Sequence, residues 1–259
     1  MNDGREVLAE VAVTAWAAVS VPLSEIESLR AQPGPPYKQP LGPKTLRFAD
    51  ELTVTGMSAI LRAINDFQLQ DRSFADWGVI AAPRFAGRMI TAANIAKQAS
   101  DPHFSISPHI IPNHCLHSVS GAASVALGIH GPNFGVGGGP NAVPELFVTA
   151  LSLLTENRVP GIWLILAEFD PEPLPDRAGA ALNAVTAHGV ALAVQANSDS
   201  GRLRLVRSPT MASSGTVRDL ANFLSNRSPD RHRWLCGLAG LGSIELALAE
   251  GQQANHVTQ

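Results

Sequence analysis

The chain has 259 residues, of which 45% are hydrophobic and 16% are charged, and its formal net charge is −3 at pH 7. That length and apolar content supply a core for one large α/β domain or two small ones. The slightly acidic balance, without a cluster of lysine and arginine, argues against a nucleic-acid surface, and no apolar run approaches the roughly 20 residues of a membrane span.

The predicted elements alternate between apolar runs and segments of helical periodicity. The predicted strands span residues 7–21, 77–83, 133–136, 161–168, 188–196 and 201–208. The predicted helices span residues 50–70, 86–100, 141–157, 215–226 and 241–251, and a further small-residue helix follows the loop that begins at residue 108. The spacer NSDSG predicts a hairpin between the last two strands, and the Pro- and Gly-dense residues 31–44 predict a surface loop. Strands that alternate with helices predict a largely parallel sheet with helices on its faces.

The two cysteines, Cys115 and Cys236, are far apart and form neither a disulfide framework nor a paired metal motif. The N-terminus shows no basic segment followed by a long apolar run and a cleavage site, so no secretory signal is expected. We therefore expect a cytoplasmic protein that binds no metal and no cofactor.

The sequence GPNFGVGGGPNAVPELF, residues 131–147, places three glycines and a proline between a short strand and a helix. Such a turn exposes backbone N–H groups at the positive end of a helix dipole, where they bind an anion or hold a nucleophile. One interpretation is a nucleotide loop at Gly135–Gly139, although proline replaces the last glycine of the fingerprint and no acidic residue lies about 20 residues further on. Another is that the glycines only allow close packing of the loop against the helix.

The residues around this turn carry a family pattern. The segment SPHIIPN…SVSGAASVALGIHGPNFGVGGGP resembles the stretch of β-ketoacyl synthases, which have the thiolase fold, that leads up to and through their nucleophile. The matching residues are Ser107, Pro108, Pro112, Asn113, Ser124, Gly128, Gly131, Pro132, Asn133 and Phe134. The resemblance implies a single ketosynthase-like domain over residues 1–259, with a mixed, mostly parallel sheet covered by helices. Its best match is 77–196, residues 210–250 form a reduced C-terminal part of a shortened second half, and residues 252–259 form a frayed tail.

The resemblance also locates a lost active site. The family's S-T-A-C motif falls on Gly137, Gly138, Gly139 and Pro140, followed by Asn141, so that a proline stands at the position of the catalytic cysteine. One of the family's catalytic histidines falls at or near Cys236. Condensation needs a thiolate that accepts the acyl chain and histidines that stabilise the oxyanion. Because proline offers no nucleophile, we expect no catalytic residue and no condensation by this chain alone.

The resemblance therefore implies a chain-length-factor-like subunit of the short kind found in aryl-polyene and type II polyketide pathways. Such a subunit forms a heterodimer or heterotetramer with an active ketosynthase, helps to shape its acyl-chain pocket and meets the acyl carrier protein through that complex. In this fold the strand before the nucleophile turn commonly pairs across the twofold axis of the dimer, and we place the interface there and in the segment Ser107–Gly121. The interface residues are Ser107, Pro108, Pro112, Asn113, Asn133, Phe134, Gly135 and Val136.

Two other functions stay open at this stage. Cys236 with a nearby histidine would be a relocated nucleophile for acyl thioesters, although a lone buried cysteine, like Cys115, is more often a small hydrophobe. The loop Gly135–Gly139 would bind a nucleotide.

Several further residues invite a functional interpretation but favour a structural one. His109, His114 and His117 cluster without a carboxylate or thiolate in clear register, so we expect loop or interface histidines rather than a metal site. Glu168 and Asp170 follow a buried strand, where α/β sites often lie, and we favour a capping or loop role. The four tryptophans are spread along the chain as core or interface anchors. They are Trp16, Trp77, Trp163 and Trp234.

Overall fold

A computed structural model describes most of the chain. The described residues are 6–38, 46–101, 103–108, 110–156, 158–176, 178, 180–196, 201–207, 215–226, 233–238, 240 and 242–248. The predicted tail 252–259 and His109 lie outside them.

Strands and helices alternate along the described residues. The strands are β1 (Glu6–Pro22), β2 (Gly78–Pro83), β3 (Asn133–Gly135), β4 (Ile162–Asp170), β5 (Thr186–Gln195), β6 (Gly201–Arg207), β7 (Arg233–Leu238) and β8 (Gly242–Ala247). The α-helices are α1 (Ile26–Ala31), α2 (Glu51–Asp66), α3 (Arg88–Ser100), α4 (Ile110–Asn113), α5 (Ser118–Leu127), α6 (Ala142–Thr155) and α7 (Val217–Ser225). A short 3-10 helix covers Leu23–Glu25. The six predicted strands and all predicted helices but the last are confirmed, with ends that differ by a few residues. None of the helices within the described residues is long and apolar enough to cross a membrane.

The named strands form one sheet in the order β3-β2-β4-β5-β1-β6-β8-β7. Strand β2 runs parallel to β3 and β4, whereas the other neighbouring pairs are antiparallel. The prediction of a mostly parallel sheet was therefore wrong. Parallel neighbours need a long crossover, which helices α3 to α6 supply between β2, β3 and β4.

Strand β1 lies between β5 and β6, so the predicted hairpin of these two strands was also wrong. The register pairs Ala12–Pro22 of β1 with β5 and Glu6–Val13 with β6. The spacer NSDSG is a turn signal, but the long first strand enters between the two strands that the spacer connects. A local turn pattern does not reveal such an insertion, because the inserted strand is distant in sequence.

The segment predicted as a helix over residues 241–251 begins instead with β8. Strand β8 pairs with both β6 and β7. The sequence analysis did not predict β7. Ile244 and Leu246 belong to one hydrophobic core, whereas Ser243 and Glu245 alternate with them. The pairing partners decide the structure of this segment, because six apolar-rich residues fit a strand and a helix equally well.

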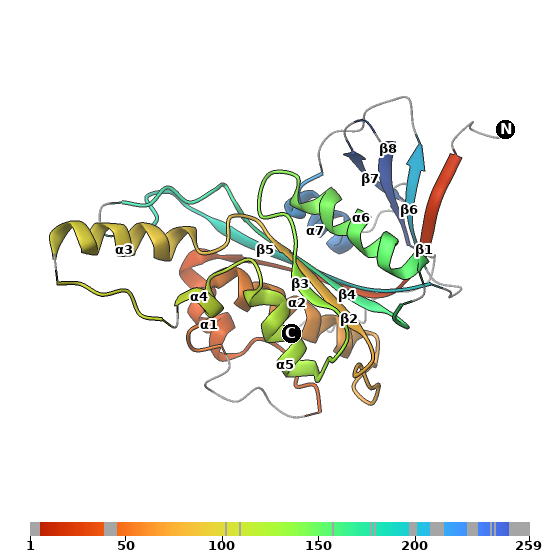
Figure 1. The fold of residues 1–259 in the computed structure, drawn as a ribbon, viewed down its shortest axis with the longest axis horizontal. Coiled ribbons are helices and arrows are strands. Elements are labelled where there is room, and N and C mark those ends of the chain that lie inside the picture. Colours follow the sequence, from red (N-terminus) through yellow and green to blue (C-terminus); the bar gives the residue numbers. More distant parts are fainter. Residues whose placement is uncertain are drawn as a thin grey trace.

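Helices cover both faces of the sheet (Figure 1). Helix α2 lies on one face, where twelve of its sixteen residues are buried and Asp50 caps it by accepting the N–H of Thr53 at 2.7 Å. Helices α6 and α7 lie on the other face and pack against a second core that includes β4, β5 and β8. All four tryptophans are buried, with at most 7% of their surface exposed, which confirms a core role for them.

Backbone contact fixes the distance between α2 and the sheet. Gly189 of β5 lies so close to α2 that a Cβ there would stand 2.7 Å from the carbonyl oxygen of Thr55. A backbone atom cannot turn away as a flexible side chain can. The glycine is therefore required for the helix to reach its place on the sheet.

We expect Gly189→Val to lower the free energy of unfolding by about 1–3 kcal/mol, because the added side chain overpacks the contact with α2. Urea denaturation followed by circular dichroism measures this change. Gly139→Ala is the matched control, since a Cβ there meets nothing within 4 Å, and its effect should stay within about 0.5 kcal/mol. Equal effects of the two substitutions would contradict this account.

Candidate functional site

The glycine turn joins β3 to α6. Gly137 and Gly138 have φ angles of 72° and 93°, a region that residues with a Cβ rarely adopt. A Cβ at Gly137 would also stand 2.7 Å from the Cα of Ala142, at the start of α6. Gly139 has an ordinary φ and an open surrounding. Two of the three glycines are thus needed for the turn, and the third is not.

The loop that follows β2 contacts this turn. Phe85, just beyond the end of β2, donates its N–H to the carbonyl of Gly138 at 3.0 Å and has a left-handed φ of 59°. A non-glycine residue in this region carries strain of about 1–3 kcal/mol that its surroundings must balance. The guanidinium groups of Arg84 and Arg88 lie 5.0 and 5.8 Å from the Phe85 ring centre. Phe85 therefore holds the glycine turn in place through this hydrogen bond, from the loop that follows β2.

The chemistry of the turn is limited by its side chains. Gly137–Asn141 offers three glycines, a proline and one amide, and both Pro140 and Asn141 are exposed. Glu145 lies in the first turn of α6, and a Cβ at Gly137 would stand 3.0 Å from its carboxylate. This negative charge occupies the end of the helix where a phosphate would bind, which argues against the nucleotide hypothesis.

The thiol of Cys236 lies in the core under α7. Its residue is fully buried, and the N–H of Gly215 donates to its sulfur at 3.3 Å. Burial raises the pKa of the Cys236 thiol, and the hydrogen bond from Gly215 opposes this only in part. A protonated thiol without access to solvent is a poor nucleophile, so these properties argue against the hypothesis of a relocated active site.

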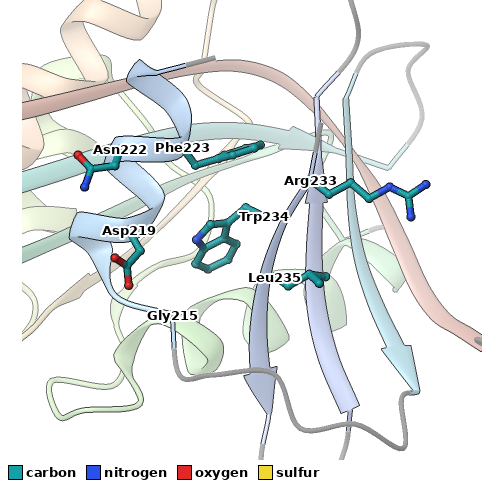
Figure 2. Close-up of a pocket in the computed structure, with 7 residues that line it drawn as sticks. All are labelled: Gly215, Asp219, Asn222, Phe223, Arg233, Trp234 and Leu235. Atoms are coloured by element: carbon teal, nitrogen blue, oxygen red, sulfur yellow. The ribbon is translucent and has the colours of Figure 1, made fainter. Parts of the chain in front are cut away.

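A half-open depression of about 420 Å³ lies between α7 and the outermost strand, β7 (Figure 2). Its lining residues are Gly215, Asp219, Asn222, Phe223, Arg233, Trp234 and Leu235. Cys236 does not line it, although it is the neighbour of Leu235 in the chain. The depression therefore gives a ligand no route to the thiol.

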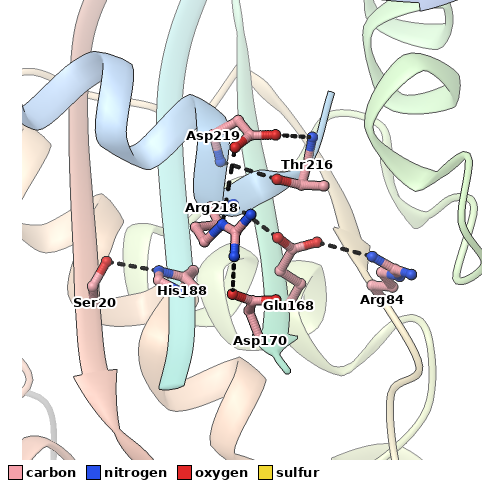
Figure 3. Close-up of polar contacts among 8 residues, drawn as sticks. All are labelled: Ser20, Arg84, Glu168, Asp170, His188, Thr216, Arg218 and Asp219. Carbon is pink, nitrogen blue, oxygen red and sulfur yellow. Dashed lines mark hydrogen bonds and ion pairs between the residues drawn. The ribbon is translucent and has the colours of Figure 1, made fainter. Parts of the chain in front are cut away.

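A polar network around the buried Glu168 joins the ends of several strands to α7 (Figure 3). Glu168 of β4 is 2% exposed; it forms an ion pair with Arg84 at 3.4 Å and accepts the N–H of Arg218 at 2.8 Å. Arg218 in turn donates to Asp170 at 2.6 Å. Glu168 thus caps the first turn of α7, as expected for a structural carboxylate. Sequence reasoning missed Arg84, although its charge at the end of a neighbouring buried strand was a signal.

Ser20, His188 and Glu168 stand opposite one another on three neighbouring strands. The Oγ of Ser20 and the Nδ1 of His188 are 2.8 Å apart. Burial lowers the pKa of His188, and the charges of Glu168 and Asp170 act in the opposite direction. A hydroxyl, an imidazole and a carboxylate in a row suggest a proton relay, but Glu168 is already engaged by Arg84 and α7. The contact between Ser20 and His188 therefore links β1 to β5.

Of the histidines before α5, His114 and His117 lie within the described residues. Burial lowers the pKa of His114, whereas the charge of Glu51 raises it. The Nδ1 of His117 lies 3.1 Å from the Oγ of Ser120. Among the described residues, no group of three or more histidine, cysteine, aspartate or glutamate side chains is arranged to hold a metal ion.

The expected interface consists of the outer strand β3 with Val136 and of the segment Ser107–Gly121. Ser107, Pro108 and Pro112 are exposed, and a Cβ at Gly135 would stand 2.0 Å from the carbonyl oxygen of Leu116. The chain that follows the exposed segment is thus packed on β3.

The backbone of β3 uses alternate residues to pair with β2. Val79 donates to Pro132 and Val136 donates to Ala81, each at 2.8 Å, and Phe134 is the residue between these bonds. In a parallel ladder the N–H and C=O groups of Asn133 and Gly135 then point away from β2. Within the described part of the chain, no further strand pairs with this edge.

A mixed sheet with helices on both faces, and a strand–turn–helix unit at its edge, is an architecture found among thiolase-like ketosynthases. Neither a protein-family model nor a curated protein matches the sequence. Among solved structures, the chain is similar to a ketosynthase in complex with its chain length factor from Xenorhabdus doucetiae. The TM-score is 0.54 at 15% identity, over 93% of this chain and 99% of that chain.

Two further structures are similar to shorter parts of the fold. A β-ketoacyl synthase from Burkholderia phymatum STM815 has a TM-score of 0.51 at 12% identity, over 73% of this chain and 60% of that one. The ishigamide ketosynthase/chain length factor has a TM-score of 0.48 at 19% identity, over 72% of this chain and 62% of that one. The chain therefore spans about three fifths of these two structures. Together with the first structure, the Burkholderia synthase shows that the chain has the thiolase-like ketosynthase fold.

We expect Glu168→Gln to lower the free energy of unfolding by about 2 kcal/mol. The substitution keeps the shape of the side chain but leaves the partly buried Arg84 without its charge partner. Asp170→Asn is the comparison, because the Asp170–Arg218 pair is more exposed and should contribute less than about 1 kcal/mol. Urea denaturation of both variants tests the ranking, and a larger effect of Asp170→Asn would contradict it.

The N-cap of α2 should make stability depend on pH. Burial raises the pKa of Asp50 from 3.8 to about 6, against the opposing effect of its hydrogen bonds with Thr53. The folded chain therefore binds a proton at the Asp50 carboxyl more tightly than the unfolded chain does. The contribution of this proton to the free energy of unfolding is complete below pH 3.8 and is lost as the pH rises through about 6.

Asp50→Asn keeps a capping oxygen but carries no charge. The stability of this variant relative to the parent chain should therefore increase by about 2 kcal/mol between about pH 4 and about pH 7, because the unfolded carboxyl is already partly ionised at pH 4. Urea denaturation over this pH range measures the difference. A difference that stays constant with pH would show that Asp50 does not titrate as described.

Proposed function

We propose that the chain is a non-catalytic, chain-length-factor-like subunit that pairs with an active β-ketoacyl synthase in polyketide or fatty acid biosynthesis. The ketosynthase fold supports this proposal, and so does the similarity over nearly the full length to a structure of a ketosynthase with its chain length factor. In that pairing the chain helps to shape the pocket for the growing acyl chain and meets the acyl carrier protein through the complex.

The single observation that carries the proposal is the turn between β3 and α6. By resemblance the position of the catalytic cysteine falls on Pro140, and Gly137–Asn141 contains no thiol, hydroxyl, imidazole or carboxylate. Condensation proceeds through a thioester on the enzyme, and such a bond needs a nucleophile. The turn keeps the strand–turn–helix backbone of the family's active site. The partner subunit supplies the nucleophile for condensation.

The edge of β3 supports pairing across a dimer. The outward N–H and C=O groups of Asn133 and Gly135 offer hydrogen bonds to a strand of another chain. The Oδ1 of Asn133 is buried and has no hydrogen-bond partner within the described residues. Unsatisfied buried polar atoms are rare in folded proteins, and a partner strand is one source of the missing donor.

Co-expression with the cysteine-containing ketosynthase encoded nearest to this chain tests the proposal. We expect one complex of both chains in size-exclusion chromatography, with condensing activity that depends on the cysteine of the ketosynthase. Asn133→Pro should weaken the complex by about tenfold or more, because it removes the outward N–H of β3 without removing a bond to β2. Separate elution of the two parent chains would exclude the proposed function.

The control for this variant is the chain alone. Asn133→Pro should keep the circular dichroism spectrum of the parent chain and its melting temperature to within a few degrees, since proline is tolerated where a strand's N–H faces outward. A complex that forms equally well with the variant would move the interface away from β3 and leave the pairing itself in place.

A further inference from the structure

The depression between α7 and β7 has no part in the proposed function. It lies at the β7 end of the sheet, whereas the glycine turn follows β3 at the other end. Small-molecule sites of similar volume combine an apolar floor with a few polar groups. Phe223 and Trp234 are 6% and 7% exposed and supply the apolar part, and Asp219 lies at the rim (Figure 2). The depression therefore has the size and the mixed lining of a small-molecule site.

Packing fixes the indole ring of Trp234 on the side of the core. Its ring centre lies 6.0 Å from that of Phe147 on α6. The backbone of Gly215 passes so close that a Cβ there would stand 2.4 Å from the six-membered ring of the indole. The nitrogen lies on the side of the ring that faces α7 (Figure 2). The ring therefore cannot turn its N–H toward another acceptor without moving this backbone.

The indole N–H of Trp234 lacks an acceptor. It donates no hydrogen bond within the described residues, although the residue is only 7% exposed. Buried tryptophan nitrogens usually find a partner. This nitrogen is not one of the fully enclosed atoms, and it opens into the depression. An oxygen atom of a bound molecule would accept this hydrogen bond.

The carboxylate of Asp219 makes the depression negative. Its Oδ2 accepts the N–H of Thr216 at 3.4 Å in the capping box of α7. Its Oδ1 lies 3.9 Å from the Nε of Arg218, whose guanidinium already donates to Asp170 at 2.6 Å. One arginine thus serves two carboxylates, and a net negative charge is left over. A positively charged ligand would offset this charge.

The arginine of the lining does not offset the charge of Asp219. Arg233 lies 3.7 Å from the carboxylate of Glu245, and Figure 2 shows its guanidinium directed away from the indole ring. An anionic ligand would therefore meet the carboxylate of Asp219 without a cation to bind it. A protonated amine would instead form a charge-assisted hydrogen bond with Asp219.

We propose that the depression binds a small protonated amine that carries an oxygen atom and an apolar side chain. The ammonium group donates to Asp219, and the oxygen accepts the N–H of Trp234. The apolar side chain contacts Phe223 and the half-exposed Leu235. Amino alcohols and the N-terminal residue of a peptide both have this chemistry. The inference does not depend on the proposed function, because none of these residues belongs to the glycine turn or to the expected interface.

Leucinol is a probe that has all three groups, and two analogues each lack one of them. Isoamylamine lacks the hydroxymethyl group, and isohexanol lacks the amine. Binding is measured by NMR of the indole N–H signals, among which Trp234→Phe identifies the signal of Trp234 by its loss. We expect leucinol to shift this signal with a dissociation constant of about 1 mM, as suits a ligand of its size. Each analogue should bind about tenfold more weakly, because one polar contact is missing.

Two substitutions separate the two polar contacts, with affinities measured by ligand-observed NMR. Asp219→Asn keeps an oxygen for the capping box but removes the charge, so leucinol should bind about tenfold more weakly while isohexanol is unaffected. Trp234→Phe keeps an aromatic ring but removes the N–H, so leucinol should bind about fivefold more weakly while isoamylamine is unaffected. Asp101→Asn, at the end of α3, is the matched control and should bind leucinol as the parent chain does.

The melting temperature shows whether each variant folds. If Trp234→Phe does not fold, the comparison of leucinol with isoamylamine on the parent chain tests the same hydrogen bond. An unshifted Trp234 signal, equal binding of leucinol and isohexanol, or parent-like binding of leucinol by Asp219→Asn would overturn the inference. The proposed function would stand in each of these cases.

The two sources of such a ligand give different results, and both support the inference. Tighter binding of leucylglycinamide than of leucinol, with loss of binding when its N-terminus is acetylated, indicates the N-terminus of a peptide. Tighter binding of leucinol indicates a free amino alcohol.

Discussion

The whole architecture depends on the position of one strand, β1, between β5 and β6. The seventeen residues of β1 are long enough to pair with β5 over one part and with β6 over another. Without this strand, the region around β2 and β4 and the antiparallel strands β6, β8 and β7 would have no common sheet. Because α2 contacts β1 on one face and α7 on the other, both helical layers also depend on it. The first strand of the chain is thus its central constraint.

The region around the turn depends on a second constraint, the buried carboxylate of Glu168. Its oxygens join Arg84 at the end of β2 to the first turn of α7. Phe85, which follows Arg84 in the chain, donates its N–H to the carbonyl of Gly138. A charge in the interior is tolerated only when it is paired, and here the pairing also fixes the loop that supports the turn. The turn therefore has a firm backbone although it has no reactive side chain.

Much of the fold could be predicted from local patterns. The apolar run before α3 and the helical periodicity of α2 were sufficient signals, because each of these elements is buried over most of its length. Strand β8 was predicted as a helix, and β1 was not expected between β5 and β6, because both outcomes depend on partners that are distant in sequence. The glycine turn was located by its composition. The strained Phe85 was not, since a positive φ at phenylalanine leaves no mark on the sequence.

The glycines of the turn also separate two kinds of evolutionary constraint. A side chain at Gly135 or Gly137 would collide with backbone atoms, and Gly138 needs its left-handed conformation. Gly139 has open space and Pro140 is exposed, so neither is held by packing. Under the proposed function, in which a partner subunit carries the catalysis, the first group must persist in descendants of this chain, whereas the last two positions are free to drift. Pro140, where the resemblance places the family's nucleophile, would then belong to the most variable part of the turn.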